Sequence, residues 1–350
     1  MDQETANALF ARGAVLLFFD APAKLEFGID CSAWTIGPLF KGIKMIPPGL
    51  HFVYYSTTSK EGTSGLRMGF FKFFESQEIV VKKWDLEIED LRDGSELDPD
   101  QVERYKLNIR SFDPNLGAYP LHPPTIYQKW QRLTDKITPL LLSRVLPQGG
   151  RVSHLPDRGG EDTDREEGVA FAAFDLRKSF PPGAAGVEVT RWSLDKSWLL
   201  GKMMDGVWGS DPKNALGELQ LAFACLLFAQ NFSGLEAWKR TVGLLCGCKE
   251  ALVERTELFV EFTNVLQTQL EECPPDFFHD ILSENNFLTH ELKTFSRNIP
   301  RTTPRLRARF ESLRMFVKRR FDWDIGGEAR AEEEDEEDED GEYAPVVVEM

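Results

Sequence analysis

The segments LHFVYY (50–55) and LRMGFFKFF (66–74) decide the fold of the first half of the chain. Both are rich in aromatic and β-branched residues, which favour strands. Turn formers, such as Pro47-Pro48-Gly49 and the glycines between 62 and 65, punctuate this region. Similar segments recur on either side: AVLLFF (14–19), SAWTI (32–36) and EIVVKKW (78–84). Several short strands at this spacing predict an antiparallel sandwich or a barrel-like sheet.

Two helices are expected after these strands, around 99–110 and 123–146. In the second, apolar residues recur at helical spacing, and Pro139 is expected to kink it. Residues 147–167 contain almost no apolar side chains, which predicts a linker or a long exposed loop. The segment VAFAAFDL (169–176) is a candidate for one more strand.

From about residue 187 the apolar residues follow a helical period. The segment LGELQLAFACLLFAQ (216–230) is apolar nearly all round, which predicts a central, fully buried helix. Further helices are expected over 252–270 and 276–282, and the last one begins with Thr303 and Pro304 as its N-cap and first residue. Its outer face is basic: Arg305, Arg307, Arg309, Arg314, Lys318, Arg319 and Arg320. These patterns predict a helical bundle or stacked helix pairs.

The chain is therefore predicted to be a multi-domain α+β protein. Residues 1–148 are expected to form a mainly-β, sandwich-like domain with terminal helices, and 149–186 a linker. Residues 187–326 are expected to form an all-α domain, and 327–350 a disordered acidic tail that ends in a strand-forming motif.

The acidic charge of the chain is concentrated in that tail. The formal net charge is −16 at pH 7, and ten acidic side chains lie between Glu332 and Glu342, so the rest carries about −6. Five cysteines, mostly in apolar surroundings, and the lack of a signal-peptide pattern predict reduced thiols in the cytoplasm or nucleus. The longest apolar run, 221–229, is too short for a bilayer, so no membrane partner is expected.

No motif of a common enzyme class occurs in the sequence: there is no GxxxxGK[ST] loop, GxGxxG turn, GxSxG elbow or HExxH helix. The nearest candidate is DFFHD, where Asp276, His279 and Asp280 lie on one face of a predicted helix. Helix capping by Asp276 and solvent exposure of Asp280 explain these residues more simply. Cys246-Gly-Cys248 lacks the CxxC spacing of a zinc site and is better explained as a helix end. We therefore predict no catalytic, cofactor-binding or metal-binding residues.

The basic face of the last helix, 304–321, offers an alternative function. Lysine and arginine side chains on one face can neutralise RNA phosphates, but no aromatic RNA-binding motif accompanies them and the chain as a whole is acidic. A solvated helix face explains the same pattern, and a third option is that the acidic tail folds back on it. An RNA-binding adaptor is thus the runner-up to a protein-binding function, and a hydrolase with a site near His279 is the weakest alternative.

The stretch EFGIDCSAWTIGPLFKGIKMIPPGLHFVYYS (26–56) resembles the opening domain of the AAR-two splicing-factor family, an assembly factor of the U5 snRNP. The resemblance continues in the family's order along the chain: RMGFF (67–71), GELQLAFACLLF (217–228), AWKR (237–240), DFFHDIL (276–282), NNFLT (285–289), FDWDI (321–325) and APVVVE (344–349). Residues 148–170 and 331–342 resemble the family less, so nothing is carried over to them.

This resemblance implies a mainly-β first domain and a helical second domain similar to a VHS-type bundle. It also implies a non-catalytic escort of the large U5 scaffold protein during snRNP biogenesis, in the cytoplasm and nucleus. Members of the family look like binders of the scaffold's RNase H-like domain and, through the C-terminal tail, of its Jab/MPN-like domain. While bound, they keep the U5 RNA helicase from docking. Small-molecule substrates and direct RNA contacts are not expected.

The expected partner-binding motif is the segment Pro345, Val346, Val347, Val348 and Glu349. Pro345 stops helix propagation and favours an extended backbone before it. Val346 and Val348 would point to one side of a strand and Val347 to the other. A segment of this kind can add a strand to an exposed sheet edge of a partner.

Overall fold

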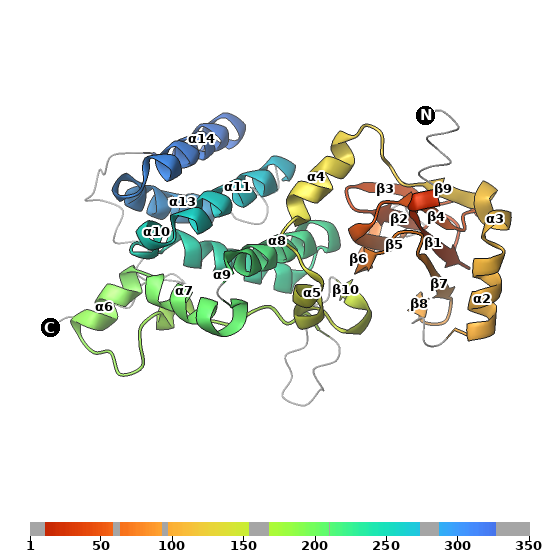
Figure 1. The fold of residues 1–350 in the computed structure, drawn as a ribbon, viewed down its shortest axis with the longest axis horizontal. Helices are drawn as coiled ribbons and strands as arrows, with labels where there is room; N and C mark the ends of the chain where they lie inside the picture. Colours follow the sequence, from red (N-terminus) through yellow and green to blue (C-terminus); the bar gives the residue numbers. More distant parts are fainter. Residues whose placement is uncertain are drawn as a thin grey trace. The chain divides into compact units, whose positions relative to one another are not determined.

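The computed structural model describes residues 11–58, 64–92, 97–153, 168–209, 211–273 and 287–326. The chain divides into two units. The first comprises Met1–Thr134, Leu142–Ala170 and Phe228–Phe232, and the second comprises Asp135–Leu141, Phe171–Leu227 and Ser233–Met350. Figure 1 shows the strands gathered in the first unit and helices α6 to α14 in the second. This order of a β-sheet region followed by a helical region confirms the predicted fold class.

Ten strands lie within the described residues and form two five-stranded sheets. One sheet has the order β8-β7-β1-β4-β9: β1 (Ala14–Phe19), β4 (Gly42–Ile46), β7 (Ile79–Asp85), β8 (Asp90–Arg92) and β9 (Leu116–Ala118). The other has the order β10-β6-β5-β2-β3: β2 (Glu26–Ile29), β3 (Ser32–Thr35), β5 (Gly49–Thr58), β6 (Ser64–Phe74) and β10 (Arg151–Ser153). The second sheet is antiparallel throughout, whereas β1 runs parallel to β7 and β4 parallel to β9.

The helices of this half of the chain are α2 (Pro99–Leu107), α3 (Ile109–Phe112), α4 (Thr125–Thr134) and α5 (Pro139–Val145). The expected helix over 123–146 is therefore two helices, with 135–138 between them. Pro139 has no amide hydrogen and disfavours a helical residue before it, so it begins α5 instead of kinking a continuous helix. The hydroxyl of Thr138 accepts a hydrogen bond from the Leu141 amide (3.2 Å) and so serves the start of α5.

The expected strand over 169–176 is wrong. These residues pair with no strand, because their backbone groups bond elsewhere. The Ala170 amide donates to the Val145 carbonyl (2.7 Å), and the Ala172 amide donates to Glu218 Oε1 (2.5 Å). Earlier in the expected linker, 149–186, strand β10 pairs with β6. The predicted domain boundaries at 148 and 187 stay predictions.

Strand β1 is buried along its whole length. Its alternate residues enter two different cores: Leu16 and Phe18 join a cluster to which both sheets contribute, and Val15, Leu17 and Phe19 join a second cluster. Helices α2 and α3 cover the second cluster with their apolar side chains. A strand with both faces buried reads as a continuous apolar run, as AVLLFF does.

The first core encloses a buried pair of polar residues. Asp30, directly after β2, and His51, on β5, are 1% and 0% exposed. His51 Nδ1 lies 2.6 Å from Asp30 Oδ2, and Nε2 lies 2.7 Å from the Pro47 carbonyl oxygen. Asp30 also accepts hydrogen bonds from the Tyr119 hydroxyl (2.6 Å) and the Phe52 amide (2.9 Å). Since a carbonyl oxygen only accepts, Nε2 is the donor to Pro47, and Nδ1 faces the Asp30 carboxyl group.

Tyr119 completes this group as a hydrogen-bond donor. Burial, reinforced by the charge of Asp30, raises the pKa of Tyr119. The phenol therefore keeps its proton, and the carboxylate has a fixed donor on every side.

The second unit contains all the remaining helices of the described residues: α6 (Val187–Leu194), α7 (Ser197–Met203), a π-helical turn (Met204–Trp208), α8 (Pro212–Ala229), α9 (Phe232–Cys246), α10 (Ala251–Glu254), α11 (Thr256–Glu272), α13 (Phe287–Asn298) and α14 (Pro304–Phe321). The expected helix over 252–270 is split between α10 and α11, because Arg255 leaves the helical conformation (φ −121°, ψ 42°). The helix expected over 276–282 and the tail 327–350 lie outside the described residues. The likeness to a VHS-type bundle stays a prediction.

Helix α8 is buried on nearly all sides, as its apolar sequence predicts. Its buried Glu218 is satisfied on both oxygens, by the Trp208 indole (2.6 Å) and the Ala172 amide (2.5 Å). A charged group in this core is tolerated because it has fixed donors. Over the ranges that the structure covers, no helix is long and apolar enough to cross a membrane.

Replacing Asp30 with alanine should lower the free energy of unfolding of the first unit by about 3–5 kcal/mol, because it leaves the donors of His51 and Tyr119 buried without an acceptor. Asp30→Asn should cost only about 1 kcal/mol, because its side-chain amide can accept from the Phe52 amide and still hydrogen-bond to His51 Nδ1. Asparagine also tolerates the left-handed backbone at this position (φ 54°). Urea unfolding followed by tryptophan fluorescence measures both changes.

Asp100→Ala, on the exposed surface of α2, is the matched control and should change the stability by less than about 0.5 kcal/mol. Equal losses for the alanine and asparagine variants at position 30 would contradict the stabilising role of these buried hydrogen bonds.

Candidate functional site

Helix α14 carries the basic residues that the sequence singles out, and it begins as expected. Thr303 accepts a hydrogen bond from the Leu306 amide with its side chain (3.4 Å), and Pro304 is the first helical residue. Its inner face is buried against the rest of the helical unit: Leu306, Phe310, Leu313, Phe316 and Val317. The ring of Phe310 packs edge-on against Phe295 of α13, with centroids 5.3 Å apart.

Three of its arginines reach polar groups of α11 and of the residue that follows it. Arg305 Nη1 lies 2.6 Å from Glu257 Oε1, and Arg320 Nη2 donates to the Cys273 carbonyl (2.7 Å). Arg309 donates through Nε to the Asn264 side chain. Burial lowers the pKa of Arg309, against the opposing charges of Glu271 and Glu261.

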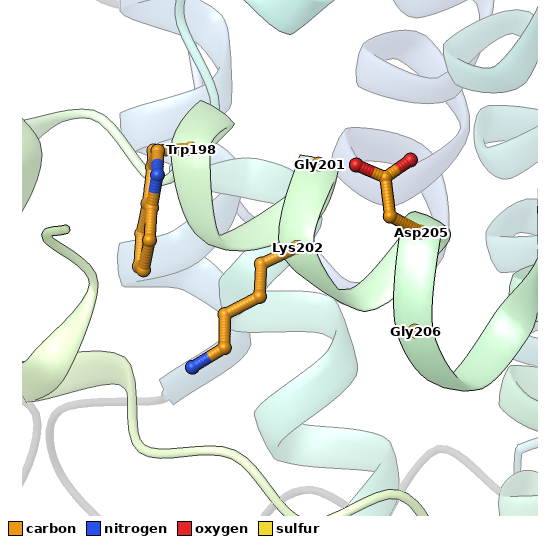
Figure 2. A pocket seen from close by; sticks show the side chains of 5 residues that line it. All are labelled: Trp198, Gly201, Lys202, Asp205 and Gly206. Atoms are coloured by element: carbon orange, nitrogen blue, oxygen red, sulfur yellow. The ribbon is translucent and has the colours of Figure 1, made fainter. Parts of the chain in front are cut away.

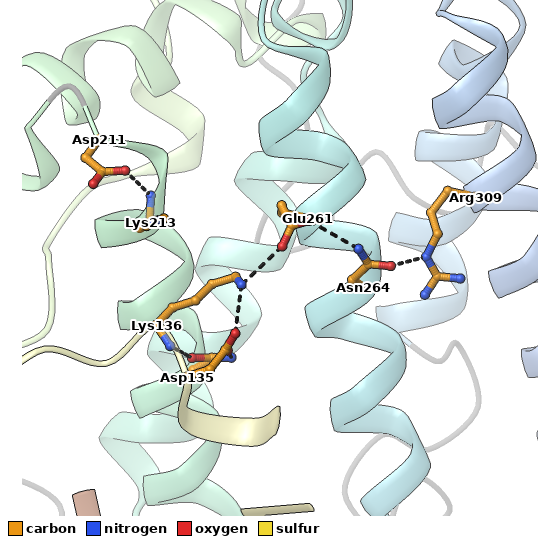
Figure 3. Close-up of polar contacts among 8 residues, drawn as sticks. Asp135, Lys136, Asp211, Lys213, Glu261, Asn264 and Arg309 are labelled. Atoms are coloured by element: carbon orange, nitrogen blue, oxygen red, sulfur yellow. Dashed lines mark hydrogen bonds and ion pairs between the residues drawn. The ribbon is translucent and has the colours of Figure 1, made fainter. Parts of the chain in front are cut away.

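The contact of Arg309 continues into a polar network (Figure 3). Asn264 Nδ2 donates to Glu261 Oε1 (3.4 Å), and Glu261 Oε2 pairs with Lys136 Nζ at 3.1 Å. Lys136 also pairs with Asp135 at 3.1 Å. The network thus ties the residues between α4 and α5 to α11 and α14 through charged hydrogen bonds.

The other basic residues of α14 form a separate surface, which we call the outer basic face: Arg307, Arg314, Lys318 and Arg319. Arg314 pairs with Glu311 at 2.7 Å, and Lys318 pairs with Asp322 at 2.9 Å. Within the described ranges, Arg307 and Arg319 are exposed and pair with no carboxylate. Met315, 65% exposed, lies on the same exposed side of the helix.

Helix α7 and the π-helical turn carry a shallow hollow of about 550 Å³. Trp198, Lys202 and Asp205 line it, and Gly201 and Gly206 leave part of it without side chains. Figure 2 shows that the side chain of Lys202 extends on the side of Trp198, whereas the side chain of Asp205 points away from Lys202. The ammonium of Lys202 lies 5.5 Å from the Trp198 ring. The acidic and basic side chains of the hollow do not converge on one point (Figure 2).

The turn before α7 is held by a buried carboxylate. Asp195 accepts hydrogen bonds from the Ser197 amide (3.0 Å), the Lys249 amide (2.8 Å) and the Glu250 amide (3.2 Å). It thereby joins the start of α7 to the start of α10. The neighbouring Cys246-Gly-Cys248 is the end of α9, as predicted, and burial raises the pKa of both thiols.

Two titratable groups lie behind this turn. Lys196 Nζ donates to the carbonyl oxygens of Leu176 (2.8 Å) and Ser193 (2.6 Å) and to the Ser179 hydroxyl (3.2 Å). Burial lowers its pKa to about 8. Burial also raises the pKa of Glu291 to about 7, although the nearby Lys196 charge opposes this. Burial of these two side chains within the helical unit accounts for both pKa shifts, so the shifts alone do not indicate a catalytic site.

Other sequence candidates are not brought together in the ranges that the structure covers. Among those residues, no group of three or more His, Cys, Asp or Glu side chains could hold a metal ion. Asp276, His279 and Asp280 lie outside the described residues, as do Pro345, Val346, Val347, Val348 and Glu349. The hollow at Trp198 and the pair of Lys196 and Glu291 were missed, because no sequence motif marks them.

The comparisons with known proteins cover both units. A model of the AAR2 N-terminal domain matches residues 12–147, and a model of the AAR2 C-terminal repeat region matches residues 171–326. The Protein AAR2 homolog of Homo sapiens is 34% identical over 390 residues, which cover 100% of this chain and 97% of that protein. The homolog of Caenorhabditis elegans is 34% identical over 359 residues, covering 92% and 97%, respectively.

Raising the pH from about 5 to 8 should lower the free energy of unfolding through Glu291, because its folded-state pKa of about 7 lies above its usual 4.5. The folded state binds the extra proton between those values, so this stabilisation is complete below pH 4.5 and is lost as the pH passes 7. Glu291→Gln should remove this decline and make the protein more stable than wild type at pH 8, by on the order of 2 kcal/mol.

Thermal unfolding at a series of pH values measures the effect. Glu188→Gln, on the exposed side of α6, is the control and should leave the pH profile unchanged. Parallel profiles for wild type and Glu291→Gln would show that Glu291 does not titrate in this range.

Proposed function

The chain belongs to the AAR2 family, and from this membership we propose that it is a non-enzymatic assembly chaperone of the spliceosomal U5 snRNP. The observation that carries the proposal is the match of both units to the two family domains, with relatives aligned over 97% of their own length. We propose that it acts in the cytoplasm and nucleus, in messenger RNA splicing.

The proposed partner is the large U5 scaffold protein. The family resemblance implies that the chain engages the scaffold's RNase H-like domain and, through its C-terminal tail, the Jab/MPN-like domain. An escort bound in this way prevents the U5 RNA helicase from docking on the scaffold until the escort dissociates. Co-purification of the scaffold with the full chain from cell extract, identified by mass spectrometry, tests the proposal. A chain that recovers no U5 protein would contradict it.

The proposed contact with the Jab/MPN-like domain is made by residues 345–349. Val346 and Val348 would enter pockets on one side of an added strand, and Val347 would face the other side. Main-chain hydrogen bonds to the edge of the partner's sheet supply affinity, and the alternating valines supply specificity.

The second candidate function is an RNA-binding adaptor that uses helix α14. The observation that favours it is the outer basic face, where Arg307 and Arg319 are exposed without a carboxylate partner in the described part of the chain. Binding that is driven by phosphates weakens steeply as salt rises, whereas strand addition does so much less. Titration with U5 RNA at two salt concentrations therefore separates the two functions.

Deleting residues 344–350 should weaken binding to the Jab/MPN-like domain about tenfold, or about 1.4 kcal/mol. Each hydrogen bond of the added strand contributes about 0.5–1.5 kcal/mol, and each buried valine about 1.5 kcal/mol. Ordering the flexible tail costs about 1–2 kcal/mol per residue, which offsets most of this gain. The loss is larger when the rest of the chain is bound to the same scaffold. Calorimetry at one salt concentration measures it.

Val347→Pro should reproduce much of this loss, because proline removes an amide donor from the added strand. Val347→Ile is the matched control, since it keeps the amide and a β-branched side chain, and it should bind like wild type. Equal affinities for the full and shortened chains would exclude strand addition.

A further inference from the structure

The chain reverses direction at the end of α14. Asp322 adopts a left-handed conformation (φ 59°), and its amide donates to the Lys318 carbonyl (3.1 Å). Trp323 then stacks on Phe321, with ring centroids 4.7 Å apart. Ile325 is buried, which anchors the returning segment against the helical unit.

This reversal brings Gly326 against the side chain of Arg314, in the middle of α14. A Cβ on Gly326 would collide with Arg314 Nη1 and Cδ, so the backbone and the side chain are in close contact. Since an α-helix rises about 1.5 Å per residue, the chain has returned about 10 Å along the helix from Phe321. The residues after 326 therefore start from a side chain of the outer basic face.

The charges on the two segments are opposite in sign, and the acidic segment carries more charges than the four basic side chains of the outer basic face. Nine basic side chains and one acidic side chain lie in 297–320, and ten acidic side chains lie in 332–342. The six residues from Gly326 to the start of the acidic segment span at most about 20 Å. Helix α14 is about 27 Å long, so the acidic segment can reach both Arg307 and Arg319 from its midpoint.

We propose that the acidic segment 332–342 of this chain docks on the outer basic face of α14 and covers it against polyanions such as RNA. Its anchors are Arg307 and Arg319, which have no carboxylate partner within the described residues. A short tether holds the segment at an effective concentration in about the millimolar range, so it outcompetes free phosphates of similar charge. The surface that suggests RNA binding is then occupied by the protein itself.

Carbodiimide coupling of carboxylates to lysine amines tests the docking in the full chain, because Lys318 is the lysine of the outer basic face. Cross-links between 332–342 and Lys318, quantified by peptide mass spectrometry at about 50 mM salt, should fall at least about threefold in the Arg307→Gln/Arg319→Gln variant. Wild type at about 500 mM salt should show a similar fall. Lys202, an exposed lysine of the same unit, is the reference for coupling efficiency.

A tether without docking would bring the acidic segment near Lys318 equally in both proteins. An unchanged yield in the double variant would therefore overturn the proposal. Neither this measurement nor the next uses the U5 scaffold, so their outcome is separate from that of the proposed function.

The covering role has its own readout, the binding of a single-stranded RNA measured by fluorescence anisotropy. Changing every Glu to Gln and every Asp to Asn in 332–342 should tighten RNA binding about tenfold at about 50 mM salt, because the basic face becomes free. Adding Arg307→Gln and Arg319→Gln should remove that gain. A neutralised variant that binds RNA no more tightly than wild type would overturn the covering role.

Discussion

Strand β1 has to be buried on both of its faces, and the architecture of the first unit follows from this constraint. Its six residues are all apolar, so neither side of the strand can face water without a large cost. One side is covered by the second sheet, which meets it in a common core. The other side requires α2 and α3, whose Tyr105 and Phe112 pack on Phe19 with ring centroids 4.4 and 5.2 Å away. A simple two-sheet sandwich would leave that side open.

The sequence predicted five of the ten strands in the described residues, namely β1, β3, β5, β6 and β7, but not their partners. Segments such as AVLLFF and LHFVYY are strands because their side chains fit a buried sheet, and this property is local. The parallel pairing of β1 with β7 depends on residues far apart in the chain, so no local pattern reports it. The segment 169–176 has the composition of a strand, yet its amides bond to the Val145 carbonyl and to the Glu218 side chain instead. Tertiary hydrogen bonding overrode propensity there.

The same division applies to the candidate site. The start of α14 at Thr303 and Pro304 could be predicted, because a helix cap depends on residues within one helix. Which arginines are free could not be predicted, because that depends on α11: Glu257, Asn264 and the Cys273 carbonyl lie opposite three of them. The raised pKa of Glu291 likewise arises only because the packing of the helices buries this side chain. A glutamate on an amphipathic helix ordinarily faces solvent, and nothing in its own neighbourhood in the sequence marks this one.

This division of the arginines also constrains function. Arg305, Arg309 and Arg320 are held by groups of the helical unit, so a ligand could recruit them only by breaking those contacts. Arg307 and Arg319 break no such contact with a described residue when they bind an anion. Their charge therefore remains available to the nearest polyanion. Under the proposed docking, that polyanion is the acidic segment of the same chain, which follows the return of the backbone to Arg314 at Gly326. A protein that works beside RNA gains specificity if its free cations are already engaged, since non-specific attraction to phosphate then competes less with recognition of a protein partner.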